Sequence, residues 1–285
     1  MTILLKRCSV CFSLCLISAP LPLAAAPDIA PPVKLARHME DTAVDYQKYY
    51  FSEKYDGVRA WWDGQNLLTR SGRVIAAPAW FTRGFPAEPL DGELWIARGR
   101  FAEVSGLVRR ESPGEGWREV SYMVFDLPAA EGDYETRYAA LGARVRAAAN
   151  PHLQRVAQTP VQSLQQLQQA LRDGTQAGAE GLMLQRRDAP YRHGRSDDLL
   201  KLTVERDAEA RVVAHLPGKG KYEGAMGALL VEDGQGRRFR IGTGFSDVER
   251  VSPPPPGAQI TYRYTGQTAT GLPRFPRYLR LRPEE

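Results

Sequence analysis

The stretch Ser52-Glu53-Lys54-Tyr55-Asp56-Gly57-Val58-Arg59 is the most informative part of this sequence. An Asp-Gly pair favours a tight turn, so Asp56-Gly57 predicts that the chain reverses just after a strand. Lys54 then lies at the end of that strand, with Arg59 close by. A lysine is a nucleophile only in its neutral form, which neighbouring positive charge and partial burial favour. The stretch indicates a nucleophile for a nucleotide phosphate, and the alternative is a surface lysine in a hairpin with Asp-Gly at its tip.

Further short segments follow in a fixed order and favour the first interpretation. They are Arg70-Ser71-Gly72, Leu90-Asp91-Gly92-Glu93-Leu94, Val124-Phe125-Asp126, Glu180-Gly181-Leu182-Met183-Leu184 and Leu199-Leu200-Lys201-Leu202. With the Lys54 stretch, this ordered set resembles the covalent nucleotidyltransferases, which comprise DNA ligases, RNA ligases and mRNA capping enzymes. The resemblance runs from about residue 33 to the C-terminus. It is strongest to the minimal bacterial ATP-dependent DNA ligases that carry a signal peptide, the Lig E type.

The resemblance implies a catalytic cycle and a role for each motif residue. Lys54 attacks the α-phosphorus of ATP and becomes lysyl-AMP; the AMP then passes to a 5′-phosphate at a nick in double-stranded DNA, and the 3′-hydroxyl displaces it. Lys54, Arg59, Arg70 and Lys201 are the implied catalytic residues. Arg59 reaches the ribose or keeps the site electropositive, Arg70 binds a phosphate, and Lys201 contacts the α-phosphate.

The remaining implied residues bind the nucleotide or a metal ion. Phe125 stacks on the adenine, Glu93 accepts hydrogen bonds from the ribose, and Arg195 in Gly194-Arg195-Ser196 is a further nucleotide contact. Glu180, together with Glu93, holds Mg²⁺, because hard cations prefer oxygen ligands. One position departs from the family pattern, which has a second lysine where this chain has Thr203. We expect the missing charge to slow adenylation, with Arg195 or a lysine of the C-terminal region compensating.

The pattern of apolar residues and turns agrees with an α+β fold. The sequence predicts a helix at 136–149, stopped by Asn150-Pro151, among strands and Asp-Gly turns. The helical spacing of apolar residues predicts a second helix at 161–172, which ends at Asp173-Gly174. Beyond residue 206 the sequence predicts short strands separated by Gly- and Pro-rich turns, as in an OB-fold barrel. The expected domains are therefore an adenylation domain at 27–206 and an OB-fold domain at 207–285.

The first 26 residues have the composition of a signal peptide. Lys6 and Arg7 precede an apolar run and then the small residues 24–26, and all three cysteines lie in this segment. The mature chain then needs no disulfide and suits the periplasm or the exterior, with no membrane attachment. Residues 207–285 carry 12 Lys and Arg against 9 Asp and Glu, an excess that suits a DNA partner. We expect a monomer.

Two alternatives remain open on the sequence. One is an RNA ligase or a capping-type nucleotidyltransferase, against which the signal peptide and the OB-like region argue. The other is a secreted nucleic-acid-binding protein with a decayed active site, which Thr203 alone supports. Labelling by ATP separates them, because a decayed protein takes up no AMP and a capping enzyme prefers GTP.

Overall fold

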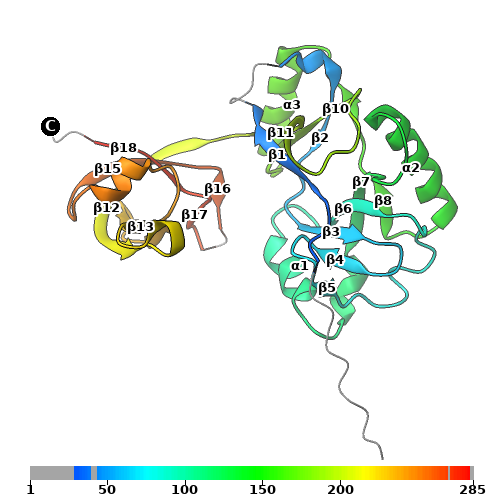
Figure 1. Ribbon diagram of the computed structural model, residues 1–285, viewed down its shortest axis with the longest axis horizontal. Coiled ribbons are helices and arrows are strands. Elements are labelled where there is room, and N and C mark those ends of the chain that lie inside the picture. Colours follow the sequence, from blue (N-terminus) through cyan, green and yellow to red (C-terminus); the bar gives the residue numbers. More distant parts are fainter. Residues whose placement is uncertain (1–28, 40–43, 269, 283–285) are drawn as a thin grey trace, which may run out of the picture.

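The computed structural model describes residues 29–39, 44–268 and 270–282. The predicted signal peptide at 1–26, with its cysteines, lies outside these residues. The described chain forms two lobes, joined where β11 (Gly194–Thr203) is followed by β12 (Arg206–Pro217) (Figure 1). No helix in the described ranges is long and apolar enough to cross a membrane.

The first sheet of the N-terminal lobe has the order β1-β11-β10-β2-β9. Its strands other than β11 are β1 (Lys34–His38), β10 (Gly181–Arg186), β2 (Tyr49–Glu53) and β9 (Thr159–Pro160). β1 runs parallel to β11, and the other pairs are antiparallel. Helix α3 (Leu164–Gln176) packs on β10 through the fully buried Leu167.

The second sheet has the order β5-β4-β3-β6-β7-β8 and carries α1 (Phe101–Val108) and α2 (Tyr134–Ala148). Figure 1 shows α2 beside β7 and β8. The parallel pair is β7 with β8, and the other pairs are antiparallel. The strands are β3 (Val58–Trp62), β4 (Leu67–Thr69), β5 (Val74–Ile75), β6 (Leu90–Trp95), β7 (Ser121–Asp126) and β8 (Leu153–Arg155).

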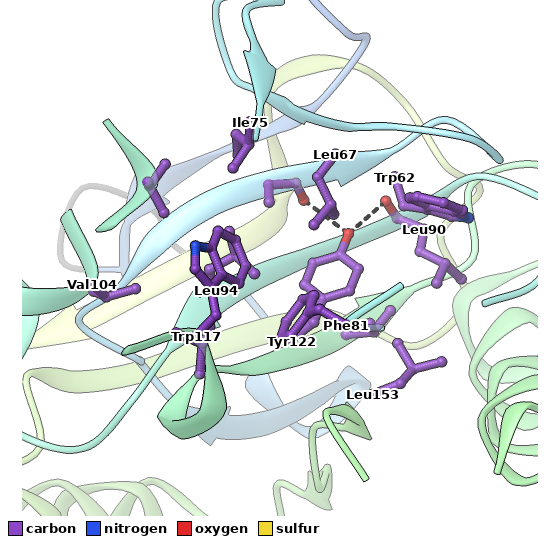
Figure 2. Close-up of a cluster of buried hydrophobic side chains, with 14 of the residues drawn as sticks. Trp62, Leu67, Ile75, Phe81, Leu90, Leu94, Val104, Trp117, Tyr122 and Leu153 are labelled. Atoms are coloured by element: carbon purple, nitrogen blue, oxygen red, sulfur yellow. Dashed lines mark hydrogen bonds between the residues drawn. The ribbon is translucent and has the colours of Figure 1, made fainter. Parts of the chain in front are cut away.

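One buried tyrosine fixes the register of the strands that carry the motifs. The hydroxyl of Tyr122 on β7 lies 3.0 Å from the carbonyl oxygens of both Ala60 on β3 and Leu90 on β6, and it donates to them (Figure 2). Because strand side chains alternate, burying Tyr122 and Val124 in this core directs Phe125 to the opposite face, toward the first sheet.

The C-terminal lobe is a small antiparallel barrel with the order β14-β13-β12-β15-β18. A bridge between Thr243 and Arg277 links the two edges of this sheet. A two-residue ribbon and the short helix α4 (Asp247–Val251), which begins with a capping box, complete the lobe. The strands are β13 (Met226–Asp233), β14 (Arg238–Ile241), β15 (Gln259–Tyr264), β16 (Gly266–Gln267), β17 (Pro273–Arg274) and β18 (Arg277–Leu281).

The α+β architecture agrees with the sequence prediction, but helix positions differ in detail. The helix predicted at 136–149 is observed as α2, which begins at Tyr134 because the Asp133 side chain accepts a hydrogen bond from the backbone of Thr136. The helix predicted at 161–172 is observed as α3, capped by Ser163 and continuing past Asp173-Gly174 to Gln176. Helix α1 was not predicted from the sequence.

Candidate active site between two sheets

A cavity of about 300 Å³ opens between the two sheets of the N-terminal lobe. Its wall is built by strands of both sheets, so residues far apart in the sequence meet there. Seven of the eight residues singled out from the sequence line it: Lys54, Arg59, Arg70, Glu93, Phe125, Arg195 and Lys201. The eighth, Glu180, forms an ion pair with Lys54. The structure thus brings together the residues of motifs that span about 150 positions.

Lys54 follows the last residue of β2, and its backbone is held in place. Its amide donates to the carbonyl oxygen of Gly181 at 2.8 Å, and its Nζ lies 2.6 Å from Glu180 Oε2. The turn after Lys54 needs a glycine, because a Cβ on Gly57 would lie 2.3 Å from the carbonyl oxygen of Leu94. The sequence predicted a positive charge, that of Arg59, near Lys54. The structure shows in addition that Lys54 forms an ion pair with the Glu180 carboxylate.

Arg59, on β3, is held by two hydrogen bonds to one carboxylate. Its Nε and Nη2 donate to Asp91 Oδ1 and Oδ2 at 2.7 and 2.6 Å, and Asp91 is fully buried. Burial alone would lower the pKa of Arg59, but Asp91 raises it, so the guanidinium stays charged. The guanidinium carbon lies 4.7 Å from the ring centroid of Phe125, within cation–π range. The cavity therefore combines an aromatic face with a fixed positive charge.

Three further cations line the cavity, in addition to Lys34 on its floor. Lys201 lies on β11 opposite Met183 of β10, and burial followed by the positive charge of Lys54 lowers the pKa of Lys201. Arg195, at the other end of β11, donates to the carbonyl oxygen of Ala36 at 2.5 Å. Arg70 is exposed at the end of β4. An anionic ligand in this cavity would meet positive charge from several directions.

Thr203, which stands where the family pattern has a second lysine, does not line the cavity of the described chain. It is 7% exposed and pairs with Gly181 at the end of β10. Its Oγ1 is buried and has no hydrogen-bond partner within the described residues. Arg195 and Lys201 are therefore the cavity-lining cations that β11 supplies.

Glu93 faces Lys54 and Arg59 from β6. Burial raises the pKa of Glu93 to about 7, although Arg59 and Lys54 act in the opposite direction. The folded protein therefore binds this proton more tightly than the unfolded chain does. Between the ordinary carboxyl pKa of 4.5 and about 7, the stability of the folded state falls as the pH rises, because the buried group must then ionise.

The substitution Glu93→Gln is expected to remove this pH dependence. The free energy of unfolding of the variant, relative to the unsubstituted protein, should increase by roughly 2–3 kcal/mol between pH 4 and pH 8. Urea unfolding followed by tryptophan fluorescence measures the stability of the N-terminal lobe, which contains Glu93, since all five tryptophans lie between residues 61 and 117. Glu111→Gln, at an exposed position, should change stability by less than about 0.5 kcal/mol at every pH. Parallel curves for Glu93→Gln and the parent would contradict the prediction.

A buried ionic cluster forms the floor of the cavity and joins the two sheets. Lys34 on β1 is 1% exposed, and its Nζ lies 2.5 Å from Asp126 Oδ2 on β7 and 2.5 Å from Gln185 Oε1 on β10. Arg137 of α2 also donates to Asp126, at 2.8 Å. Burial alone would raise the pKa of Asp126, but Lys34 and Arg137 hold it below its usual range.

The sequence did not single out these supporting residues. Asp91 and Asp126 stand inside quoted motifs, next to Gly92 and Phe125, so motif position was a usable signal for both. Lys34 and Gln185 lie in ordinary strand patterns, where a lysine or glutamine is normally exposed. Their pairing spans 151 positions and becomes visible only when β1 and β10 are placed together.

The protein alone offers few ligands for a metal ion. Among the described residues, no group of three or more His, Cys, Asp and Glu side chains could hold one. The carboxylates of Glu93 and Glu180 nevertheless interact with each other beside Lys54. Two carboxylates fit Mg²⁺, which commonly takes one or two from the protein and its other ligands from water and substrate phosphates.

Comparison with known proteins agrees with this geometry. The ATP dependent DNA ligase domain family matches residues 29–202, and the DNA ligase OB-like domain family matches residues 217–282. A DNA ligase of Haemophilus influenzae (strain ATCC 51907 / DSM 11121 / KW20 / Rd) is 40% identical over 232 residues, which cover 81% of this chain and 86% of that protein.

Solved structures give the same result. A structure from work on Lig E DNA ligases, described as DNA binding with a minimal scaffold, is 42% identical and superposes with a TM-score of 0.83 over 89% of this chain and 100% of its own. The Chlorella virus DNA ligase-adenylate shares the fold at 23% identity, with a TM-score of 0.52 over 90% of this chain and 100% of its own.

These matches confirm the predicted α+β fold, with an adenylation domain followed by an OB-like domain. They also confirm the predicted class of enzyme. The first family model spans more than half of the chain, and the Haemophilus relative exceeds 30% identity over most of both sequences. The chain therefore belongs to the ATP-dependent DNA ligases, and within them to the minimal Lig E type.

Proposed function

We propose that this ligase seals nicks between a 5′-phosphate and a 3′-hydroxyl in double-stranded DNA through a lysyl-AMP intermediate on Lys54. The observation that carries the proposal is the setting of Lys54, whose Nζ stands at a cavity that also presents Phe125, Arg59, Lys201 and Glu93. The aromatic face suits an adenine, the cations suit a phosphate chain, and the carboxylate suits the hydroxyls of a ribose.

The first step joins the lysine to the nucleotide. Lys54 Nζ attacks the α-phosphorus, a P–N bond forms, and the P–O bond to pyrophosphate breaks. Lys54 must first lose its proton, and the Glu180 carboxylate at 2.6 Å is placed to hold that proton. Lys201 and Arg59 offset the charge that develops on the phosphoryl oxygens, which is how such transfers are mainly catalysed.

The later steps reuse the same cations. An oxygen of the DNA 5′-phosphate attacks the phosphorus of lysyl-AMP and releases Lys54. The 3′-hydroxyl then attacks the 5′-phosphate, and AMP leaves. Arg70, exposed at the rim, suits the nicked phosphate. Glu93 and Glu180 would hold Mg²⁺, which supplies further neutralisation of phosphate charge when bound.

We propose that the two expected domains, 27–206 and 207–285, bind nicked DNA together as a monomer in the periplasm or outside the cell, after removal of residues 1–26. The basic surplus of the C-terminal region supports the DNA contact. The composition of the first 26 residues supports export.

A nick-sealing reaction tests the proposal. Purified protein is mixed with Mg²⁺, ATP labelled at the α-phosphate, and a duplex with one 5′-phosphorylated nick, and protein and DNA are each resolved on denaturing gels. We expect covalent label on the protein and a sealed strand. Label from GTP in place of ATP would instead indicate a capping-type enzyme, and sealing confined to nicked RNA an RNA ligase. Neither label nor sealing by folded protein would indicate a decayed site.

The C-terminal lobe contributes directly to the turn that follows Lys54. Arg274 on β17 donates from Nη2 to Asp56 Oδ1 at 2.7 Å, and its Nη1 contacts the other oxygen of this carboxylate. Both side chains are largely buried, at 22% and 17% exposure. The ion pair therefore holds the OB-like domain against the nucleophile's turn.

The substitution Arg274→Gln is expected to slow lysyl-AMP formation about tenfold. Gln can still donate one hydrogen bond to Asp56, and loss of the other, at the low end of the roughly 1.5–3 kcal/mol of a hydrogen bond to a charged group, corresponds to about a factor of ten. The rate is measured without DNA, from the label transferred to the protein. Arg280→Gln removes the same charge from an exposed position on β18 and should leave the rate within about twofold. Equal rates for the two variants would show that the pair does not support adenylation.

A further inference from the structure

The connection between β10 and β11 carries a tyrosine into the space beneath the cavity. The hydroxyl of Tyr191 donates to Asp91 Oδ2 at 2.8 Å. Its ring lies 5.1 Å from Lys34 Nζ and 6.3 Å from the ring of Trp61 on β3. A residue from the first sheet's connection thus reaches a carboxylate of the second sheet.

The Asp91 carboxylate is shared between this tyrosine and the cavity arginine. Arg59 occupies both oxygens, through Nε on Oδ1 and Nη2 on Oδ2, and Tyr191 adds a third donor on Oδ2. Asp91 is fully buried, so no bulk water replaces a lost donor. Three donors from two directions fix the plane of the carboxylate, and this plane fixes the Arg59 guanidinium.

Tyr191 influences the cavity through Arg59. Within the described residues, the cavity wall includes Arg59 and Phe125 but not Tyr191. Burial, followed by the charge of Asp91, raises the pKa of Tyr191 far above its ordinary value, so the hydroxyl remains a donor throughout the neutral range. Loss of this hydroxyl alone would leave Arg59 as the one side-chain partner of the carboxylate within the described residues, so that carboxylate and guanidinium could shift together.

We propose that Tyr191 is a positioning residue for nucleotide binding, which holds Arg59 over Phe125 through the buried carboxylate of Asp91. The proposal rests on the proposed function, because it takes the cavity to be the ATP site. It means that a residue outside the motifs, in the β10–β11 connection, influences the affinity for ATP.

Tyr191→Phe tests this requirement, because it keeps the ring and removes the hydroxyl. The ATP concentration for half-maximal formation of lysyl-AMP should rise about five- to tenfold, and the maximal rate should stay within about twofold. Tyr50→Phe is a matched control, since Tyr50 also donates to a carboxylate, Glu135 Oε1, at 2.8 Å, but at an exposed position. The control should leave both quantities unchanged.

A second comparison separates positioning from general damage. Arg59→Lys keeps the charge but cannot bind Asp91 through a planar fork. If Tyr191 acts through Arg59, adding Tyr191→Phe to Arg59→Lys should raise the ATP requirement by less than about twofold. Full additivity, or an unchanged ATP requirement in Tyr191→Phe alone, overturns the proposal. Because the unsubstituted protein is labelled in the same assay, absence of label there would count against the proposed function instead.

Discussion

Lys54→Ala is expected to reduce formation of the covalent AMP adduct, and nick sealing with ATP, by ~10⁴-fold or more, because the substitution removes the attacking atom itself. Other lysines cannot readily substitute. Lys201, which also lines the cavity, is fixed on β11. Lys34 is engaged by Asp126 and Gln185 on the cavity floor. The measurement is transfer of label from α-labelled ATP to the protein, followed by sealing of a phosphorylated nick.

The same variant should still join a nick whose 5′ end already carries AMP, within about tenfold of the parent rate, since that step needs no lysine nucleophile. Lys48→Ala is the control, because Lys48 is an exposed lysine six residues earlier and should leave every step unchanged. Covalent label on Lys54→Ala would mean that another residue is the nucleophile. Failure on both kinds of nick would point to a damaged fold.

The second large effect is expected on stability. Lys34→Met keeps an unbranched side chain, one atom shorter, and removes the charge that Asp126 and Gln185 share at 2.5 Å each. Gln185 Oε1 is then left buried without its donor, and Asp126 keeps only its bonds outside β1, such as that from Arg137. Removing one partner of a buried ion pair costs about 3–5 kcal/mol, so a loss of about 3 kcal/mol is expected.

Tryptophan fluorescence during urea unfolding isolates this loss to the adenylation domain, where all five tryptophans lie. Lys48→Met makes the same chemical change at an exposed position and should shift stability by less than about 0.5 kcal/mol. If both variants unfold at the same urea concentration, the cluster under the cavity does not hold the two sheets together.

Local sequence signals predicted the parts of the fold that depend on neighbouring residues. The Asp-Gly pair after Lys54 predicted a tight reversal of the chain, but the structure has only a bend at Gly57, where the chain passes from β2 of the first sheet to β3 of the second. The stop signal at Asn150-Pro151 correctly predicted where α2 ends. Helix α1 was missed because Ser105-Gly106 lowers the helix propensity of a segment only eight residues long.

The position of α3 was set by long-range contacts and a cap. The amide of Val161 donates to the carbonyl oxygen of Tyr49 at 3.0 Å, so this residue extends the sheet instead of starting the helix. At the other end, Gly174 is tolerated inside the helix, and the chain leaves it near Gly178, whose φ of +89° suits glycine. Neither effect has a local signature that outweighs the apolar periodicity.

In the candidate site too, local sequence signals were predictive and long-range contacts were not. The residues singled out from the sequence stand in short motifs, and the resemblance of these motifs to those of the nucleotidyltransferases implied that they meet in one site. Of the groups that hold them in place, Asp91 and Asp126 stand inside these motifs, but Lys34, Gln185 and Tyr191 do not. Tyr191 reaches Asp91 across 100 positions, and Lys34 reaches Gln185 across 151, so only the folded arrangement of the sheets reveals them.

The ion pair between Asp56 and Arg274 joins residues that are synthesised at different times. The two residues are 218 positions apart, and a ribosome that adds about 5–20 residues per second produces Arg274 at least ~10 s after Asp56. A chain that ends before β17 therefore lacks this contact on the segment that follows Lys54, and the pair can form only after the second domain has been synthesised.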